Sequence, residues 1–182
     1  MVKLSGAKDT VRMSSGRPEQ ISGGEGTQPG AITIREAGEA DLPAILQLYA
    51  QPEMDDGDVL PLDTARAIFR QFGAYPHYVL YVAEHQGRIA GSYALLVMDN
   101  LGHLGAPSAI VEDVVVEPSA HGQGLGQAMM RHALAEARLS GCYKLMLSSN
   151  AKRHRAHAFY EALGFERHGY SFRIGLEGGE PE

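Results

Sequence analysis

The sequence predicts an α/β fold in which helices pack on the faces of a mixed sheet. Short apolar runs alternate with segments of helical periodicity from residue 31 onward. Turn-forming glycines separate many of these segments. In the stretch 109–126, an apolar run is followed at once by a glycine-rich loop and then by an amphipathic helix. Elements in this order form a sheet that is covered by helices.

Length, charge and cysteine content limit the class of protein. A chain of 182 residues suits one well-buried domain rather than two. The net charge of −6 argues against a general nucleic-acid binder, which usually has a basic excess. No apolar run approaches the length that spans a bilayer. The single cysteine, Cys142, cannot form an intrachain disulfide, which favours a reducing compartment. We therefore expect a cytoplasmic protein without nucleic-acid or membrane partners.

Residues 1–30 are rich in Gly, Ser, Gln and Pro and show no hydrophobic period. Such a segment cannot bury enough apolar surface to offset the entropy lost on ordering. We expect a flexible N-terminal arm over residues 1–30, part of it an added leader, with Met13 as a candidate native start. The folded domain is expected over residues 31–182.

The first elements are a strand, two helices and an acidic loop. Residues 32–35 alternate apolar and polar side chains like a strand. Asp41 is predicted to cap a helix that has Pro43 in its first turn and ends near residues 51–52. The loop 53–58 lacks the ligand spacing of a calcium loop, so we expect no metal there. A second helix is predicted from Asp63 to Gly73, with one face formed by Ala67, Ile68 and Phe72.

The remaining elements alternate between strands and helices. Two strands, 78–84 and 89–98, are joined by a hairpin at Gly87, and the second is apolar on both faces and therefore central. The stretch 109–117 is the next strand, followed by a helix to about residue 140. The last predicted elements are a strand, a helix and two short strands, at 143–148, 156–163, 165–167 and 170–174.

The glycine loop after Pro118 predicts an anion site. Backbone N–H groups converge between a strand and a helix N-terminus when no side chains intervene. A Walker loop is excluded, because Gln127 stands where its lysine would follow the last glycine. A dinucleotide site is disfavoured, because the next strand ends in residues 148–150 without an acid. The pyrophosphate of coenzyme A is the third candidate.

Residues 112–118 followed by 121–126 resemble motif A of the GNAT superfamily of N-acetyltransferases. Asn150, together with residues 158–165, resembles its motif B. The resemblance covers residues 31–176 and is nearest to the aminoalkylphosphonate and glucosamine-6-phosphate N-acetyltransferases. It implies a GNAT fold, with a mixed, mostly antiparallel central sheet of six to seven strands and helices on both faces. It also implies acetyl-CoA as cofactor and a homodimer.

The resemblance also implies which residues bind the cofactor. The main chain of Val114, Val115 and Val116 would bind the pantetheine arm, and the Val114 N–H would stabilise an oxyanion. The pyrophosphate loop and a further cofactor contact would be formed by His121, Gly122, Gln123, Gly124, Leu125, Gly126 and Asn150. His121 departs from the family pattern, which usually opens this loop with Gln or Arg. A neutral imidazole supplies less positive charge to the pyrophosphate.

Two side chains are candidates for proton transfer. Glu112 lies two residues before Val114, on the same face of a regular strand, where it would accept a proton from the ammonium or anchor the amine. Asp113 is predicted to point the other way. Tyr160 matches the motif B tyrosine that protonates the thiolate, and its ordinary pKa of about 10 lies near that of a thiol.

The sequence leaves the acceptor open. Arg153 and His154, in a basic group, favour an anionic acceptor such as a phosphorylated amine, whereas Asp55 in the acidic loop favours a polyamine or an aminoglycoside. We expect an N-acetyltransferase that acetylates a primary amine of a small molecule by direct attack in a ternary complex. A protein or peptide amino-group acetyltransferase and a non-catalytic acyl-CoA-binding sensor are the alternatives.

Overall fold

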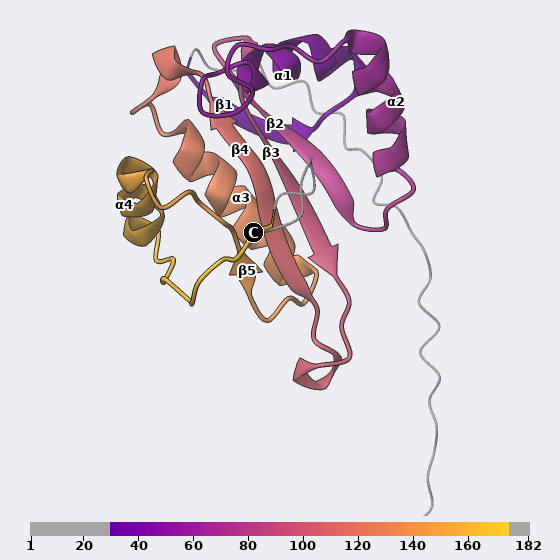
Figure 1. Ribbon diagram of the computed structural model, residues 1–182, viewed down its shortest axis with the longest axis vertical. Coiled ribbons are helices and arrows are strands. Elements are labelled where there is room, and N and C mark those ends of the chain that lie inside the picture. Colours follow the sequence, from indigo (N-terminus) through magenta and orange to yellow (C-terminus); the bar gives the residue numbers. More distant parts are fainter. Residues whose placement is uncertain (1–29, 175–182) are drawn as a thin grey trace, which may run out of the picture.

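The computed structural model describes residues 30–174, which form one sheet and its covering helices (Figure 1). The predicted N-terminal arm lies outside the described residues except for Gly30. The strands are β1 (Ile32–Glu36), β2 (Tyr78–His85), β3 (Arg88–Met98), β4 (Ser108–Val116) and β5 (Leu145–Met146). The helices are α1 (Leu42–Tyr49), α2 (Leu62–Phe72), α3 (Leu125–Leu139) and α4 (His154–Ala162). Among these helices, none is long and apolar enough to cross a membrane.

The sheet has the order β1-β2-β3-β4-β5. The first three pairings are antiparallel and β4 pairs with β5 in parallel. It is therefore a mixed sheet of five strands, where the resemblance implied six to seven strands and a mostly antiparallel arrangement. Residues 165–167 and 170–174 are not strands, and Tyr170 and Phe172 are 92% and 91% exposed. Alternation of apolar residues was insufficient there, because a strand also needs a neighbour to pair with.

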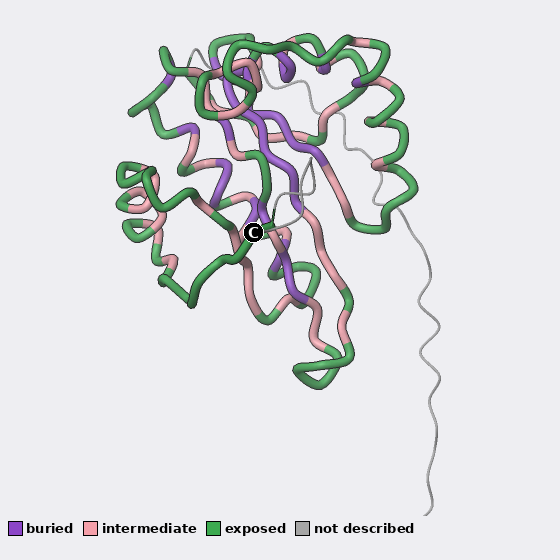
Figure 2. Tube along the Cα trace, viewed as in Figure 1, coloured by how far each residue is buried: buried purple, intermediate pink, exposed green. Residues whose placement is uncertain are grey.

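Each face of the sheet is covered by helices, and the buried chain runs through the central strands (Figure 2). The helical period of the sequence predicts an apolar stripe of Leu125, Met129, Met130, Ala133, Leu134 and Ala137, and on one face α3 buries all of these except the half-buried Leu134. They pack against a group that includes the stacked rings of Tyr81 and Tyr93, 5.2 Å apart. On the other face Ile45 of α1 packs against β2 and β3. The predicted arrangement of helices on both faces is confirmed.

Two details of the first helices differ from prediction. Helix α2 turns Leu62, Ala65 and Phe69 toward α1. Of the predicted apolar face, Phe72 packs against the core, whereas Ala67 and Ile68 are exposed, so the prediction was wrong at these two positions. The helical period was read correctly, but the position of α1 decides which side of α2 is covered. Asp41 stands at the N-cap position of α1 but makes no capping hydrogen bond with its side chain.

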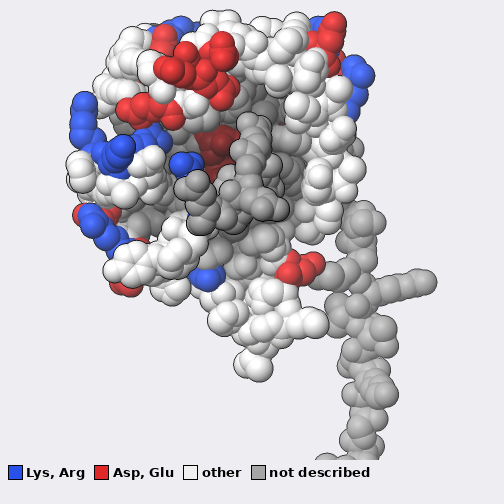
Figure 3. Space-filling model, in the orientation of Figure 1, with Lys and Arg blue, Asp and Glu red and all other residues white. Residues whose placement is uncertain are grey.

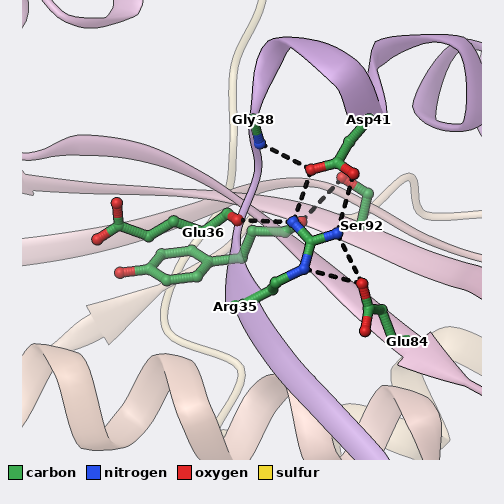
Figure 4. Close-up of polar contacts among 7 residues, drawn as sticks. Arg35, Glu36, Gly38, Asp41, Glu84 and Ser92 are labelled. Atoms are coloured by element: carbon green, nitrogen blue, oxygen red, sulfur yellow. Dashed lines mark hydrogen bonds and ion pairs between the residues drawn. The ribbon is translucent and has the colours of Figure 1, made fainter. Parts of the chain in front are cut away.

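Asp41 instead joins a polar network around Arg35 (Figure 4). Its carboxylate accepts a hydrogen bond from the Gly38 N–H at 2.7 Å and pairs with the Arg35 guanidinium at 2.6 Å. Arg35 also pairs with Glu84 of β2 at 2.6 Å. The guanidinium holds the pKa of the Asp41 carboxyl below its usual range. This network ties β1 to β2 and to the start of α1.

Candidate active site

Strands β4 and β5 separate soon after they meet. They pair only through Ala109 with Leu145 and Ile110 with Met146, and β5 ends there. The strand predicted at 143–148 is therefore reduced to two residues. A cavity of about 150 Å³ lies where the strands separate. It is lined by Met54, Val111, Glu112, Asp113, Val114, Leu147, Ser148, Ser149, Arg153 and Tyr160.

A β-bulge in β4 directs both carboxylates into this cavity. Ala94 of β3 faces Glu112 and Ser92 faces Val115, so β4 has one extra residue over this interval. Asp113 lies within this bulge and has a φ of 52°, in the left-handed region. A bulge interrupts the alternation of side chains along a strand. The prediction that Asp113 points away from Glu112 was therefore wrong, since both line the cavity.

The cavity raises the pKa of both carboxyl groups, Glu112 and Asp113. Burial, and then the charge of Asp113, raise the pKa of Glu112 above its usual range. Burial, and then the charge of Asp55, raise the pKa of Asp113. A carboxylate with a raised pKa accepts a proton more readily at neutral pH. Glu112 thus has the property that a general base needs.

Tyr160 reaches the same cavity from α4. Its ring packs edge-on against Phe159 and Phe165, with centroid distances of 5.2 and 5.7 Å. Burial raises the pKa of the Tyr160 phenol, although the charge of Arg153 opposes this shift. The phenol therefore stays protonated at neutral pH and can donate a proton. A phenol and two carboxylates that line one cavity are suited to moving protons through one reaction.

The glycine loop leads from β4 into α3. Gly122 and Gly124 have φ values of 76° and 86°, which side chains disfavour. Gly124 caps α3 without a side-chain hydrogen bond, so the first N–H groups of the helix are available to an anion. A Cβ on Gly126 would lie 3.1 Å from Phe159 Cζ. This glycine lets α4, and with it Tyr160, pack against the start of α3.

A family model described as the acetyltransferase (GNAT) family matches residues 42–165. This region contains the cavity, the glycine loop and helices α1 to α4. The chain belongs to the GNAT family. Members of this family are acyltransferases and generally use acetyl-CoA.

Named relatives and solved structures agree with this membership. The glucosamine 6-phosphate N-acetyltransferase of Trypanosoma brucei brucei is 40% identical over 90 residues, 50% of this chain and 59% of the relative. The aminoalkylphosphonate N-acetyltransferase of Salmonella typhimurium is 33% identical over 100 residues, 55% of this chain and 63% of the relative. The chain thus spans less than two thirds of either GNAT relative. A solved Agrobacterium tumefaciens structure has a TM-score of 0.73 at 34% identity, covering 79% of this chain and 99% of that chain.

The residues of this GNAT chain fit the cofactor that the family generally uses. The uncapped start of α3 and the loop glycines offer N–H groups to a pyrophosphate. Val115 is 5% exposed, so its side chain belongs to the core and not to a ligand-binding surface. Beyond Ile110 the outer side of β4 is not paired with β5, which leaves main-chain groups for the amides of a pantetheine arm.

Three of the predicted cofactor residues have local partners in the structure. His121 Nε2 donates to the Val116 carbonyl at 3.1 Å, as does Gln51 Nε2 at 3.3 Å. Gln123 Nε2 donates to the Ser119 carbonyl at 2.9 Å. The Asn150 side-chain oxygen accepts the Lys152 N–H at 2.9 Å, which stabilises the turn before α4. Their roles toward the cofactor stay predictions.

His85 is a site-supporting residue that sequence reasoning missed. It is 7% exposed at the end of β2, and its Nε2 lies 3.0 Å from Gln123 Oε1. With Nε2 protonated, the imidazole donates a hydrogen bond to the Gln123 side-chain oxygen and so holds the glycine loop against the end of β2. Its position beside a hairpin gave no sequence signal, because the loop that it touches is far along the chain.

The predicted acceptor residues separate into two groups. Arg153 lines the cavity, and its Nη2 pairs with Glu53 of the α1–α2 loop at 2.7 Å. Asp55 lies in the same loop next to Met54, which lines the cavity. His154 is exposed and is not among the lining residues. The structure thus brings Arg153 to the cavity and leaves His154 outside it.

Proposed function

We propose that this chain is an acetyl-CoA-dependent N-acetyltransferase that acetylates a primary amine of a small molecule by direct attack in a ternary complex. The observation that carries the proposal is that Glu112 and Tyr160 line one cavity, the first from β4 and the second from α4. That cavity lies where β4 and β5 separate, on the strand that leads into the anion-binding loop. Its size suits the reacting end of an amine.

Bound acetyl-CoA supplies an activated acetyl thioester. Glu112 accepts the proton of the ammonium, directly or through one water, so that the amine nitrogen can attack the acetyl carbonyl carbon. The Val114 N–H donates to the oxygen on which negative charge develops. Tyr160 O–H donates its proton to the sulfur as the carbon–sulfur bond breaks. The amine nitrogen gains the acetyl group and gives up its second proton to water, the thiol leaves protonated, and the Tyr160 phenolate regains a proton from water, so that one net proton leaves with Glu112.

Each role is supported by the environment of its group. The raised pKa of Glu112 brings proton acceptance closer to neutral pH. The raised pKa of Tyr160 keeps its proton in place until a thiolate forms. The bulge at Asp113 interrupts regular pairing next to Val114, which is the local distortion that a main-chain donor needs to turn toward a ligand.

The test measures acetyl-CoA binding and thiol release separately. Acetyl-CoA at about a hundred times its Kd should stabilise the full chain by about 2.7 kcal/mol against unfolding. Release of CoA with small primary amines would support the proposal. Release only with peptides would make the chain a protein acetyltransferase. Stabilisation without release on any amine or peptide would make it an acyl-CoA sensor, and either result would overturn the proposal.

A further inference from the structure

The acceptor cavity holds more negative charge than one general base requires. Glu112 and Asp113 both line it, through the bulge in β4. Asp55 is close enough for its charge to raise the pKa of Asp113. Burial, and with it the charge of Asp113, raises the pKa of Tyr49 and Tyr78, from α1 and β2. The carboxylates at the cavity therefore lie close to residues of the first helix and of the central sheet.

The positive charge at the cavity is already engaged. Among the lining residues, Arg153 carries the positive charge, and its guanidinium pairs with Glu53 at 2.7 Å. The rim beside Glu53 is acidic as well, since Asp55, Asp56 and Asp58 are exposed. Figure 3 shows acidic side chains gathered above a hollow, further acidic atoms set back inside it, and basic side chains along its left side. An anionic acceptor would therefore meet like charge inside the hollow.

The ligand groups that this wall can satisfy follow from its carboxylates. An ammonium group has three N–H donors and no acceptor, so the acceptor oxygens of Glu112 and Asp113 match it. The neighbouring carboxylates of Glu112 and Asp113 repel one another, and a cationic ligand in the cavity would offset this repulsion.

We propose that the acceptor is an amine with a second cationic group, such as a diamine, a polyamine or another polyaminated molecule. One amine is acetylated beside Glu112, while the second ammonium is held between Asp113 and Asp55. This inference rests on the proposed function and deepens it. It also separates this chain from relatives whose names specify a phosphorylated or a phosphonylated amine.

The test compares three amines that share a four-carbon chain: putrescine, butylamine and aminobutylphosphonate. Their far ends are positive, neutral and negative, so the comparison isolates the charge of the second group. We expect kcat/KM for putrescine to exceed that for butylamine by about tenfold at low salt, and aminobutylphosphonate to react most slowly. Added salt should narrow both differences.

Matched variants locate the effect. Asp55→Asn should raise KM for putrescine by about fivefold and leave butylamine unchanged. Asp99→Asn, an equal charge change at the exposed end of β3, is the control and should change neither. Equal or faster reaction of aminobutylphosphonate, or an Asp55→Asn variant that keeps the full preference for putrescine, would overturn this inference while acetyl transfer itself stands. A lack of CoA release with every amine, despite stabilisation by acetyl-CoA, would instead overturn the proposed function.

Discussion

Glu112 of β4 and Tyr160 of α4 line one cavity, although they lie far apart in the sequence. The bulge at Asp113 brings the carboxylate there, and the close contact of Phe159 with Gly126 brings the phenol. Two independent packing features therefore assemble the proposed proton-transfer pair.

Tyr160→Phe should lower kcat by about 10²- to 10⁴-fold, because the departing sulfur loses its proton donor. The Kd for acetyl-CoA should change little, since the ring still packs between Phe159 and Phe165. Thiol-release assays measure kcat, and calorimetric titration measures the Kd for acetyl-CoA. Tyr143→Phe, at a tyrosine that is 41% exposed and stacked on His103, is the matched control. A kcat within about twofold of the unmodified chain would remove Tyr160 as the acid.

Glu112→Gln should lower the rate and change its pH dependence. The raised pKa of Glu112 means that the base becomes protonated, and the rate falls, at a higher pH than for an ordinary glutamate. The glutamine variant should lose this acidic limb when kcat is measured against pH with the same amine. If the limb survives in Glu112→Gln and disappears in Asp113→Asn, the base is Asp113.

Asp113→Asn should raise the thermal stability of the free protein at neutral pH. Because the folded-state pKa of Asp113 is raised, the ionised group costs stability, and this cost appears as the pH rises through that pKa. Asparagine has the same shape and tolerates the left-handed backbone at this position. We expect Tm to rise by about 1–3 °C at neutral pH, the gain to shrink as the pH falls below the raised pKa, and to vanish only below the ordinary pKa of an aspartic acid. Asp58→Asn, in an exposed loop, should not reproduce this pH dependence. A lower Tm at neutral pH would contradict the charge assignment.

His85→Leu should weaken acetyl-CoA binding by about threefold to tenfold and leave kcat at saturation unchanged, because His85 positions Gln123 in the loop. The measurement is the Kd for acetyl-CoA together with kcat. A purely structural role would lower Tm without this separation of Kd from kcat. Restoration of the Kd in His85→Gln, which keeps a donor near Gln123, would support positioning. Unchanged affinity in both variants would refute it.

Much of the fold could be predicted along the chain. The strands around Gly87, the apolar stripe of α3 and the glycine loop all came out as expected, because each depends on residues within a few positions of one another. The number of strands in the sheet was predicted wrongly, since residues 170–174 alternate like a strand but have no pairing partner within the described chain. The apolar face of α2 was misplaced at two positions for a similar reason, because α1 decides which side is covered.

By itself the sequence determined the order of the elements, the anion loop and the two residues proposed for proton transfer, because periodicity, glycine spacing and motif order are local properties. Only the tertiary structure decided the direction of Asp113 and the pairing of Arg153 with Glu53. Strand register places one extra residue opposite β3, and the fold brings the α1–α2 loop to α4. Neither relationship leaves a trace in neighbouring residues, and both bear on the charge of the acceptor cavity.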